Sequence, residues 1–146
     1  MKCKYSIRMR REIFGVTSFY VGALAAIASI IFATKTCAMG DHRPLWGGGL
    51  AFACYMAGTL FLGSKPTNWR FVLPILLLLP VIAWQSGWAL SFFFDYMADG
   101  WPVCGTLTSM ELEPDEASGG IILTWVLSCV TACLGLGLAF CRMTKE

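Results

Sequence analysis

Few residues in this chain have side chains that could carry out chemistry, and they lie far apart. His42 is the only histidine, and it directly follows Asp41. Asp95 and Asp99 could join this pair around a metal ion, but no motif such as HExxH places the four together. The glycines at 47–49 lack the following Lys and Ser or Thr of a phosphate-binding loop. We therefore predict no metal, no cofactor and no enzymatic activity.

The seven cysteines are the other reactive side chains. None belongs to a CxxC pair, which four-helix membrane thiol oxidases use, so the sequence does not favour a redox enzyme. Cys54, Cys129 and Cys133 lie inside long apolar segments, where a thiol behaves as a small apolar group.

Four such apolar segments make up most of the chain. They cover residues 13–33, 45–62, 71–94 and 119–141, and each is near the ~20 residues that an α-helix needs to cross a bilayer. The first exceeds the apolar core of a signal peptide, so we expect it to be retained. We predict an all-α membrane protein with one domain, residues 1–146, in which four transmembrane helices form a compact antiparallel bundle.

The interiors of these segments contain no charged residue. Transporters that couple to protons or ions usually place a carboxylate, histidine or arginine inside a span. The sequence therefore argues against ion coupling.

The positive charges predict the orientation of the helices. Nine of the 11 Lys and Arg residues precede the first segment, follow the fourth, or lie between the second and third. The positive-inside rule then places both termini in the cytoplasm. We expect a multi-pass protein of the plasma membrane, specifically a bacterial inner membrane.

The connection 95–118 then lies outside the membrane, and it contains six acidic residues and no basic one. The outer connections also contain one cysteine each, Cys37 and Cys104. We predict that these two form a disulfide, which requires their Cα atoms to approach within about 7 Å.

Small residues in the first, second and fourth segments indicate where helices pack closely. Lipid tails are as apolar as leucine, so membrane helices associate where small side chains let their backbones approach. The residues to which we assign this role are Gly22, Ala26, Gly58, Ser128 and Gly135.

The third segment is bulkier. Leu73, Leu76–Leu79 and Ile82 predict a surface that faces lipid, with a site for a partner helix as the alternative. Pro74 and Pro80 each remove a backbone donor and predict a bend in the inner half.

Gln85 is the most unusual residue of this segment, because an amide in hydrocarbon needs a hydrogen-bond partner. We assign it to helix packing. The candidate partners on other segments are Thr59, Thr124, Ser128 and Thr131.

Five of the six tryptophans lie toward the predicted outer side. An interfacial aromatic belt explains Trp46 and Trp125 well, whereas Trp84 lies ~15 Å inside the end of its segment. The alternative is a docking surface for a lipid, a quinone or a protein, since aromatic side chains anchor interfaces. The predicted partner-binding residues are Trp84, Trp88, Trp101, Asp95, Asp99, Glu111 and Glu113.

These features favour a non-enzymatic interaction protein. Its partners would be membrane lipids and another membrane or membrane-active protein, and not nucleic acid. Inner-membrane immunity proteins against pore-forming toxins share this general build, although no motif links the chain to them. The alternatives are an accessory subunit of a larger membrane complex and a small passive channel or carrier.

Overall fold

The computed structural model describes residues 2–35, 43–63, 68–99 and 116–142. These residues form five helices, and no strand occurs among them. The helices are α1 (Lys2–Lys35), α2 (Arg43–Gly63), α3 (Trp69–Leu76), α4 (Leu79–Asp99) and α5 (Glu116–Cys141). The prediction of an all-helical protein is confirmed for this part of the chain.

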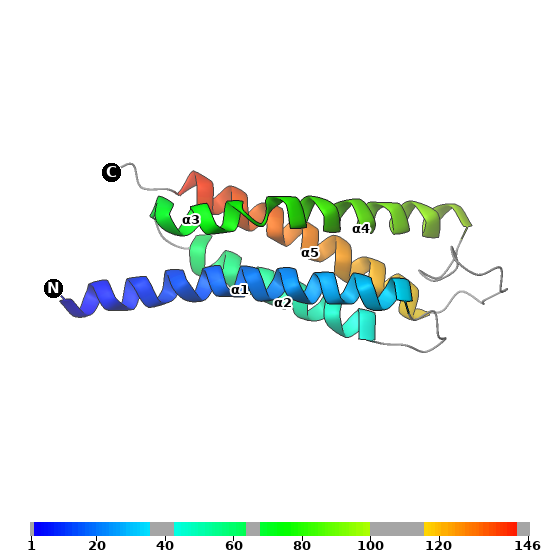
Figure 1. Cartoon of the computed structure of the whole chain (residues 1–146), viewed down its shortest axis with the longest axis horizontal. Helices are drawn as coiled ribbons and strands as arrows, with labels where there is room; N and C mark the ends of the chain where they lie inside the picture. The colour runs from blue at the N-terminus through cyan, green and yellow to red at the C-terminus, as the bar shows by residue number, and fades with distance from the viewer. Residues whose placement is uncertain (1, 36–42, 64–67, 100–115, 143–146) are drawn as a thin grey trace.

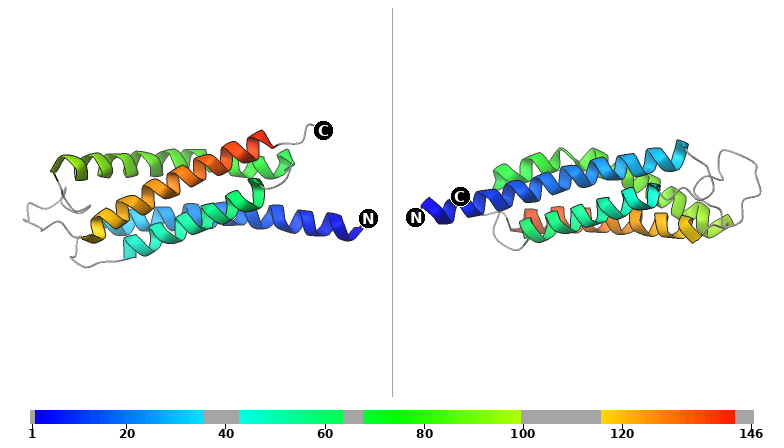
Figure 2. Two further views of the ribbon diagram at one scale, coloured as in Figure 1. Left: turned by 180° about the vertical axis from the view of Figure 1, so that it is seen from behind. Right: turned by 90° about the horizontal axis from the view of Figure 1, so that it is seen from below.

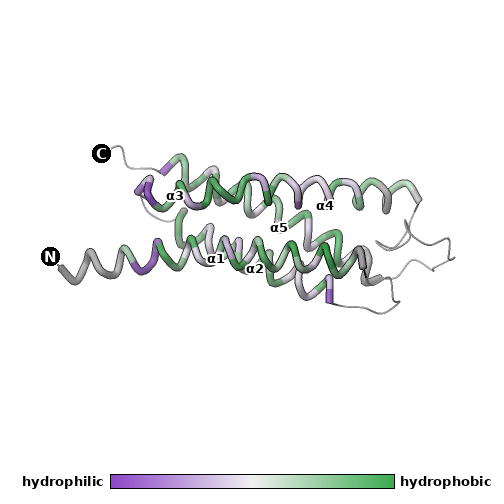
Figure 3. Tube along the Cα trace, in the orientation of Figure 1, coloured by the Kyte–Doolittle hydropathy of each residue, from purple (hydrophilic) through white to green (hydrophobic). Residues whose placement is uncertain are grey.

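Three of the helices are long and apolar enough to cross a membrane, and α3 with α4 gives a fourth if the bent pair counts as one span. The stretches are Met9–Ala33, Arg43–Leu62, Gly119–Cys141, and Trp69–Leu76 with Leu79–Phe94. They match the four apolar segments of the sequence to within a few residues. Figure 3 shows apolar residues along the helices, with hydrophilic residues near their ends.

The helices lie alongside one another as a bundle, with both chain termini at the same end (Figure 1). Figure 2 shows the same arrangement from behind and from below. The most extensive contacts are those of α2 with α1 and with α5, whereas α4 packs mainly on α5 and less closely. We call α1, α2 and α5 the three-helix body, and α3 with α4 the bent arm.

Glycines allow the close approach of α1 and α2. A Cβ built on Gly22 would lie 3.1 Å from Cδ1 of Tyr55, and one built on Gly58 would lie 2.5 Å from Cδ2 of Phe19. The Gly58 position is also 3.1 Å from the carbonyl oxygen of Gly15, so backbone as well as side chain closes this space. Any side chain at Gly58 would therefore push the two helices apart.

The contact between α2 and α5 is built in the same way. A Cβ on Gly135 would meet Thr59 and would lie 2.6 Å from Cζ of Phe19. Ala26 and Ser128 are also buried in the interior. By contrast, no other part of the described molecule lies within 4 Å of a Cβ on Gly137.

The bent arm is divided at Leu77 and Leu78, where the direction of the helix axis changes by 47°. Pro80 has no N–H to donate to the carbonyl of Leu76, and its ring crowds that carbonyl. The bend expected from the prolines is therefore present, and the third apolar segment forms two helices.

The bend also frees backbone groups that need other partners. The N–H of Leu78 donates to the carbonyl of Ile75, three residues away, at 2.9 Å. The carbonyl of Pro74 accepts a hydrogen bond from the Tyr20 hydroxyl of α1, also at 2.9 Å. This bond attaches the arm to the three-helix body beside its break.

The expectation that the leucines of the bent arm all face away from the bundle is wrong in part. Leu73, Leu77 and Leu79 are exposed, but Leu78 and Ile82 are buried against the body. These two side chains lie on the same face of the arm as Gln85, Ala89 and Phe92, which are also buried. Leu78 thus belongs to the core.

We predict that Gly58→Ala destabilises the protein by about 1–3 kcal/mol, because the new methyl group overpacks the contact with Phe19 and Gly15. Gly137→Ala is the matched control on an open helix face, and it should leave stability unchanged or raise it by up to about 1 kcal/mol. Unfolding of the purified protein in mixed detergent micelles, followed by circular dichroism, measures both. Equal losses would show that Gly58 is not a point of close packing.

Candidate functional site

Gln85 of α4 connects the bent arm to the interior of the body. Its side chain is fully buried. The Tyr55 hydroxyl of α2 donates to Gln85 Oε1 at 3.1 Å, and Gln85 Nε2 donates to Cys129 Sγ of α5 at 3.5 Å. One amide therefore links three helices, as a buried amide between apolar surfaces requires.

The hydroxyl residues that we expected to pair with Gln85 bond to backbone carbonyls instead. Thr59 Oγ1 donates to Tyr55 O at 2.7 Å and to Thr131 O at 3.2 Å. Ser128 Oγ donates to Gly48 O at 3.2 Å, again between α5 and α2. These bonds reinforce the three-helix body. The sequence did not indicate Tyr55 as the partner of Gln85, because an aromatic residue within an apolar segment gives no sign of where its hydroxyl points.

Trp125 does not belong to an interfacial belt. It is only 1% exposed, and its Nε1 donates to Ser29 Oγ at 2.7 Å. Ser29 Oγ in turn donates to the carbonyl of Pro44 at 2.5 Å. The indole therefore connects α5 with α1 and α2, and the belt interpretation of this residue is wrong. Trp46, which is 77% exposed, differs from it in this respect.

A series of ring contacts leads from this buried indole to the surface of α4. Trp125 lies 5.4 Å from Phe92, and Phe92 stacks on Trp88 at 5.4 Å. Trp88 then meets Trp84 edge to face at 6.2 Å. We call these four residues the aromatic ladder. Each ring fixes the orientation of the next, so the exposed tryptophans are held from the core outward.

The outer end of the ladder forms part of a shallow depression. Trp84 and Trp88 are 43% and 36% exposed, and they line a hollow of about 340 Å³ with Gly87 and Ser91. No other part of the described molecule lies within 4 Å of a Cβ built on Gly87. The glycine therefore leaves room for another backbone to approach beside the indoles.

The remaining predicted partner-binding residues belong to the end of α4 and to the segment that follows it. Asp95 and Asp99 lie in the last turns of α4. Trp101, Glu111 and Glu113 fall outside the described residues, as do Cys37 and Cys104 of the predicted disulfide. The structure thus brings together Trp84 and Trp88, and the acidic part of the site stays a prediction.

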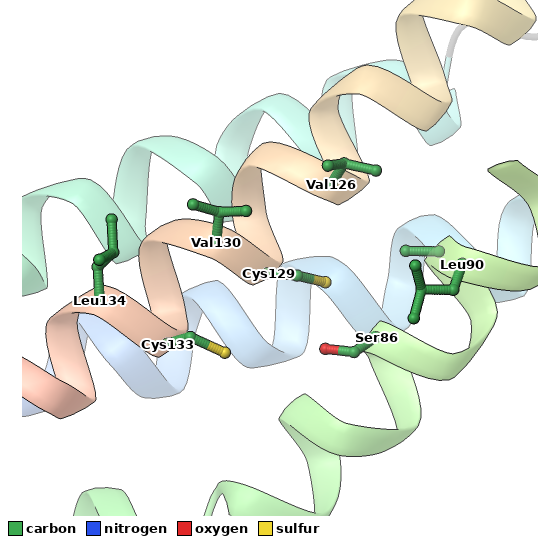
Figure 4. A pocket seen from close by; sticks show the side chains of 8 residues that line it. Ser86, Leu90, Val126, Cys129, Val130, Cys133 and Leu134 are labelled. Atoms are coloured by element: carbon green, nitrogen blue, oxygen red, sulfur yellow. The ribbon is translucent and has the colours of Figure 1, made fainter.

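A second hollow, of about 360 Å³, lies between α4 and α5 (Figure 4). We call it the thiol groove. Its lining is apolar except for one hydroxyl and two thiols, and consists of Ser86, Ala89, Leu90, Val126, Cys129, Val130, Cys133 and Leu134.

Two arginines stabilise the ends of α2. The guanidinium of Arg11 donates to the carbonyl of Phe61 in the last turn, at 2.9 Å from Nε and 2.6 Å from Nη2. A cation at this end complements the helix dipole, and α2 has no basic residue in its own last turn. Arg43, at the other end, lies 5.1 Å from the ring centre of Phe32 on α1, within cation–π range.

We predict that Gln85→Leu destabilises the protein by about 1–3 kcal/mol, because it leaves the Tyr55 hydroxyl buried without its acceptor. Adding Tyr55→Phe removes that hydroxyl and should restore part of the loss. A double-mutant cycle on unfolding free energies measures the coupling, expected at about 0.6–2 kcal/mol. Strictly additive effects would mean that the two side chains do not interact.

The chain was compared with known proteins at three levels. No protein-family model, curated protein or solved structure matches it significantly. Inference about its function therefore rests on its own residues.

Proposed function

We propose that the chain is a four-span protein of the plasma membrane, of the bacterial inner-membrane type, with both termini in the cytoplasm. Support comes from the three long apolar helices and the apolar bent arm, which would make four crossings if the bent arm counts as one span. The positive charges favour the same side for both termini, and α1 begins and α5 ends at the same end of the bundle (Figure 1).

The function that the geometry supports best is recognition of another membrane or membrane-active protein, without enzymatic chemistry. The observation that carries it is the aromatic ladder, whose ring contacts connect the exposed Trp84 and Trp88 of α4 with the buried Trp125. Tryptophans held in this way supply contact area at little cost in side-chain entropy, and they are enriched among the residues that dominate binding energy.

A transmembrane helix is the form of partner that suits this surface. Gly87 lines the same hollow as the two indoles and would let a partner backbone approach, as small residues do between membrane helices. The acidic segment after α4 would then contact parts of the partner outside the membrane. An immunity protein that neutralises a pore-forming toxin would use such a surface. A permanent accessory subunit would use it too, and the two differ in whether the partner is always bound.

Accessibility labelling tests the orientation. On a background without native cysteines, Thr106→Cys should react with a membrane-impermeant maleimide in intact cells, because segment 95–118 is expected outside. Ser64→Cys, in the connection after α2, should react only after the membrane is permeabilised. The opposite pattern would overturn the proposed topology.

The recognition surface is tested by Trp84→Ala and Trp88→Ala. Each should weaken binding by about 30-fold or more, the effect of losing an interface residue worth about 2 kcal/mol. Trp46→Ala is the control, because this exposed indole belongs to the first turn of α2 and lies outside the ladder.

The measurement depends on which kind of partner the cell provides. Protection against the toxin encoded beside the gene should fall for an immunity protein, and stoichiometric co-purification in mild detergent should fall for an accessory subunit. Binding that tolerates both substitutions would exclude the α4 surface. Flux through liposomes that contain the purified chain alone would favour a carrier instead.

A further inference from the structure

The thiol groove contains a pair of thiols that the proposed recognition surface does not use. Cys129 and Cys133 both line the groove from α5, and Ser86 faces them from α4. Figure 4 shows both sulfur atoms pointing to the same side of α5, toward the Ser86 hydroxyl. Both thiols are free rather than disulfide-bonded.

The spacing of the two thiols suits a single bridging ion. Residues four apart on a helix have Cβ atoms about 5–6 Å from each other. Two metal–sulfur bonds of about 2.3 Å, arranged in line, span about 4.6 Å. Rotation about the side-chain bonds of Cys129 and Cys133 can cover this small difference.

Polar groups already converge on one of the two sulfurs. Gln85 Nε2 donates to Cys129 Sγ at 3.5 Å, and the Tyr55 hydroxyl orients the amide by donating to its other end. A thiolate, and not a thiol, is the form that binds metals. A donor held beside a ligating sulfur is the kind of outer interaction that supports a metal ligand.

The number of ligands and the apolar surroundings together select the ion. Among the described residues, no three of His, Cys, Asp and Glu form a metal-binding group, so an ion that needs four protein ligands, such as zinc, is not accommodated. Two thiolates with a divalent ion form a neutral unit, whereas a monovalent ion would leave a net negative charge. Because a net charge in apolar surroundings is costly, the groove favours a soft divalent ion that accepts two sulfur ligands.

We propose that Cys129 and Cys133 form a two-coordinate site for a soft, thiophilic divalent metal ion, for which mercuric ion is the probe. Binding from mercuric chloride breaks two S–H bonds and forms two Hg–S bonds. Two protons pass to water and two chloride ions leave, with no change in oxidation state. This site is separate from the recognition surface, because its two thiols lie on α5 in another hollow.

The test compares three forms of the full chain in detergent, each titrated with mercuric chloride in excess monothiol. The first retains only Cys129 and Cys133, with the other five cysteines replaced by serine. It should bind one ion per chain, at least about 100-fold more tightly than a form that also carries Cys133→Ser, because the second thiolate binds at a high effective concentration.

The third form is the matched control. It carries Cys129→Ser and regains Cys141, so that it has two thiols on α5 placed two turns apart. The monothiol should remove mercury from this form as easily as from the single-thiol form. Equal retention by the Cys133 and Cys141 pair, or two ions bound per chain in the first form, would overturn the proposal.

A second measurement avoids dependence on multiple substitutions. The unmodified chain and two single variants are exposed to mercuric chloride, washed with monothiol and weighed by intact-protein mass spectrometry. Cys133→Ser should retain one ion fewer than the unmodified chain, and Cys141→Ser should retain the same number. Equal retention by Cys133→Ser and the unmodified chain would contradict a bidentate site.

Discussion

The close approach of α2 to α1 on one side and to α5 on the other is the contact on which the rest of the structure depends. It is possible because Gly22, Gly58 and Gly135 leave no side chain between the backbones. Apolar side chains gain nothing by leaving lipid for one another, so packing between close backbones has to supply the stability. The hydroxyl contacts of Ser128 and Thr59 with backbone carbonyls follow from the same closeness.

The bent arm is attached to this body by a few specific contacts. Tyr20 meets a carbonyl beside the break, Gln85 meets Tyr55 and Cys129, and Phe92 meets Trp125. Between these points α4 lies less closely on α5 than α2 does, which leaves the thiol groove. The outer side of α4 carries the exposed tryptophans. The features that could engage other molecules therefore belong to the arm and to its junction with α5.

The two candidate sites differ in the chemistry they offer. The aromatic ladder ends in a shallow surface with no charged residue among its lining side chains, which suits a large apolar partner. The thiol groove offers few polar groups to a ligand, namely one hydroxyl and two thiols. Both depend on Gln85 and Phe92 to hold α4 in position. A change that loosened the arm would alter the two sites together.

The four apolar segments, the bend at the prolines and the small residues that allow close packing could all be predicted from the sequence. The length of an apolar segment, the N–H that proline lacks and the side chain that glycine lacks are local properties of the chain. The sequence misjudged Trp125 and Leu78, since exposure depends on which face of a helix meets a neighbour. It also missed Tyr55 as the partner of Gln85. The burial of Trp125 and Leu78 and the pairing of Tyr55 with Gln85 follow from the tertiary structure, because the bend and the register between helices determine which buried groups meet across the bundle.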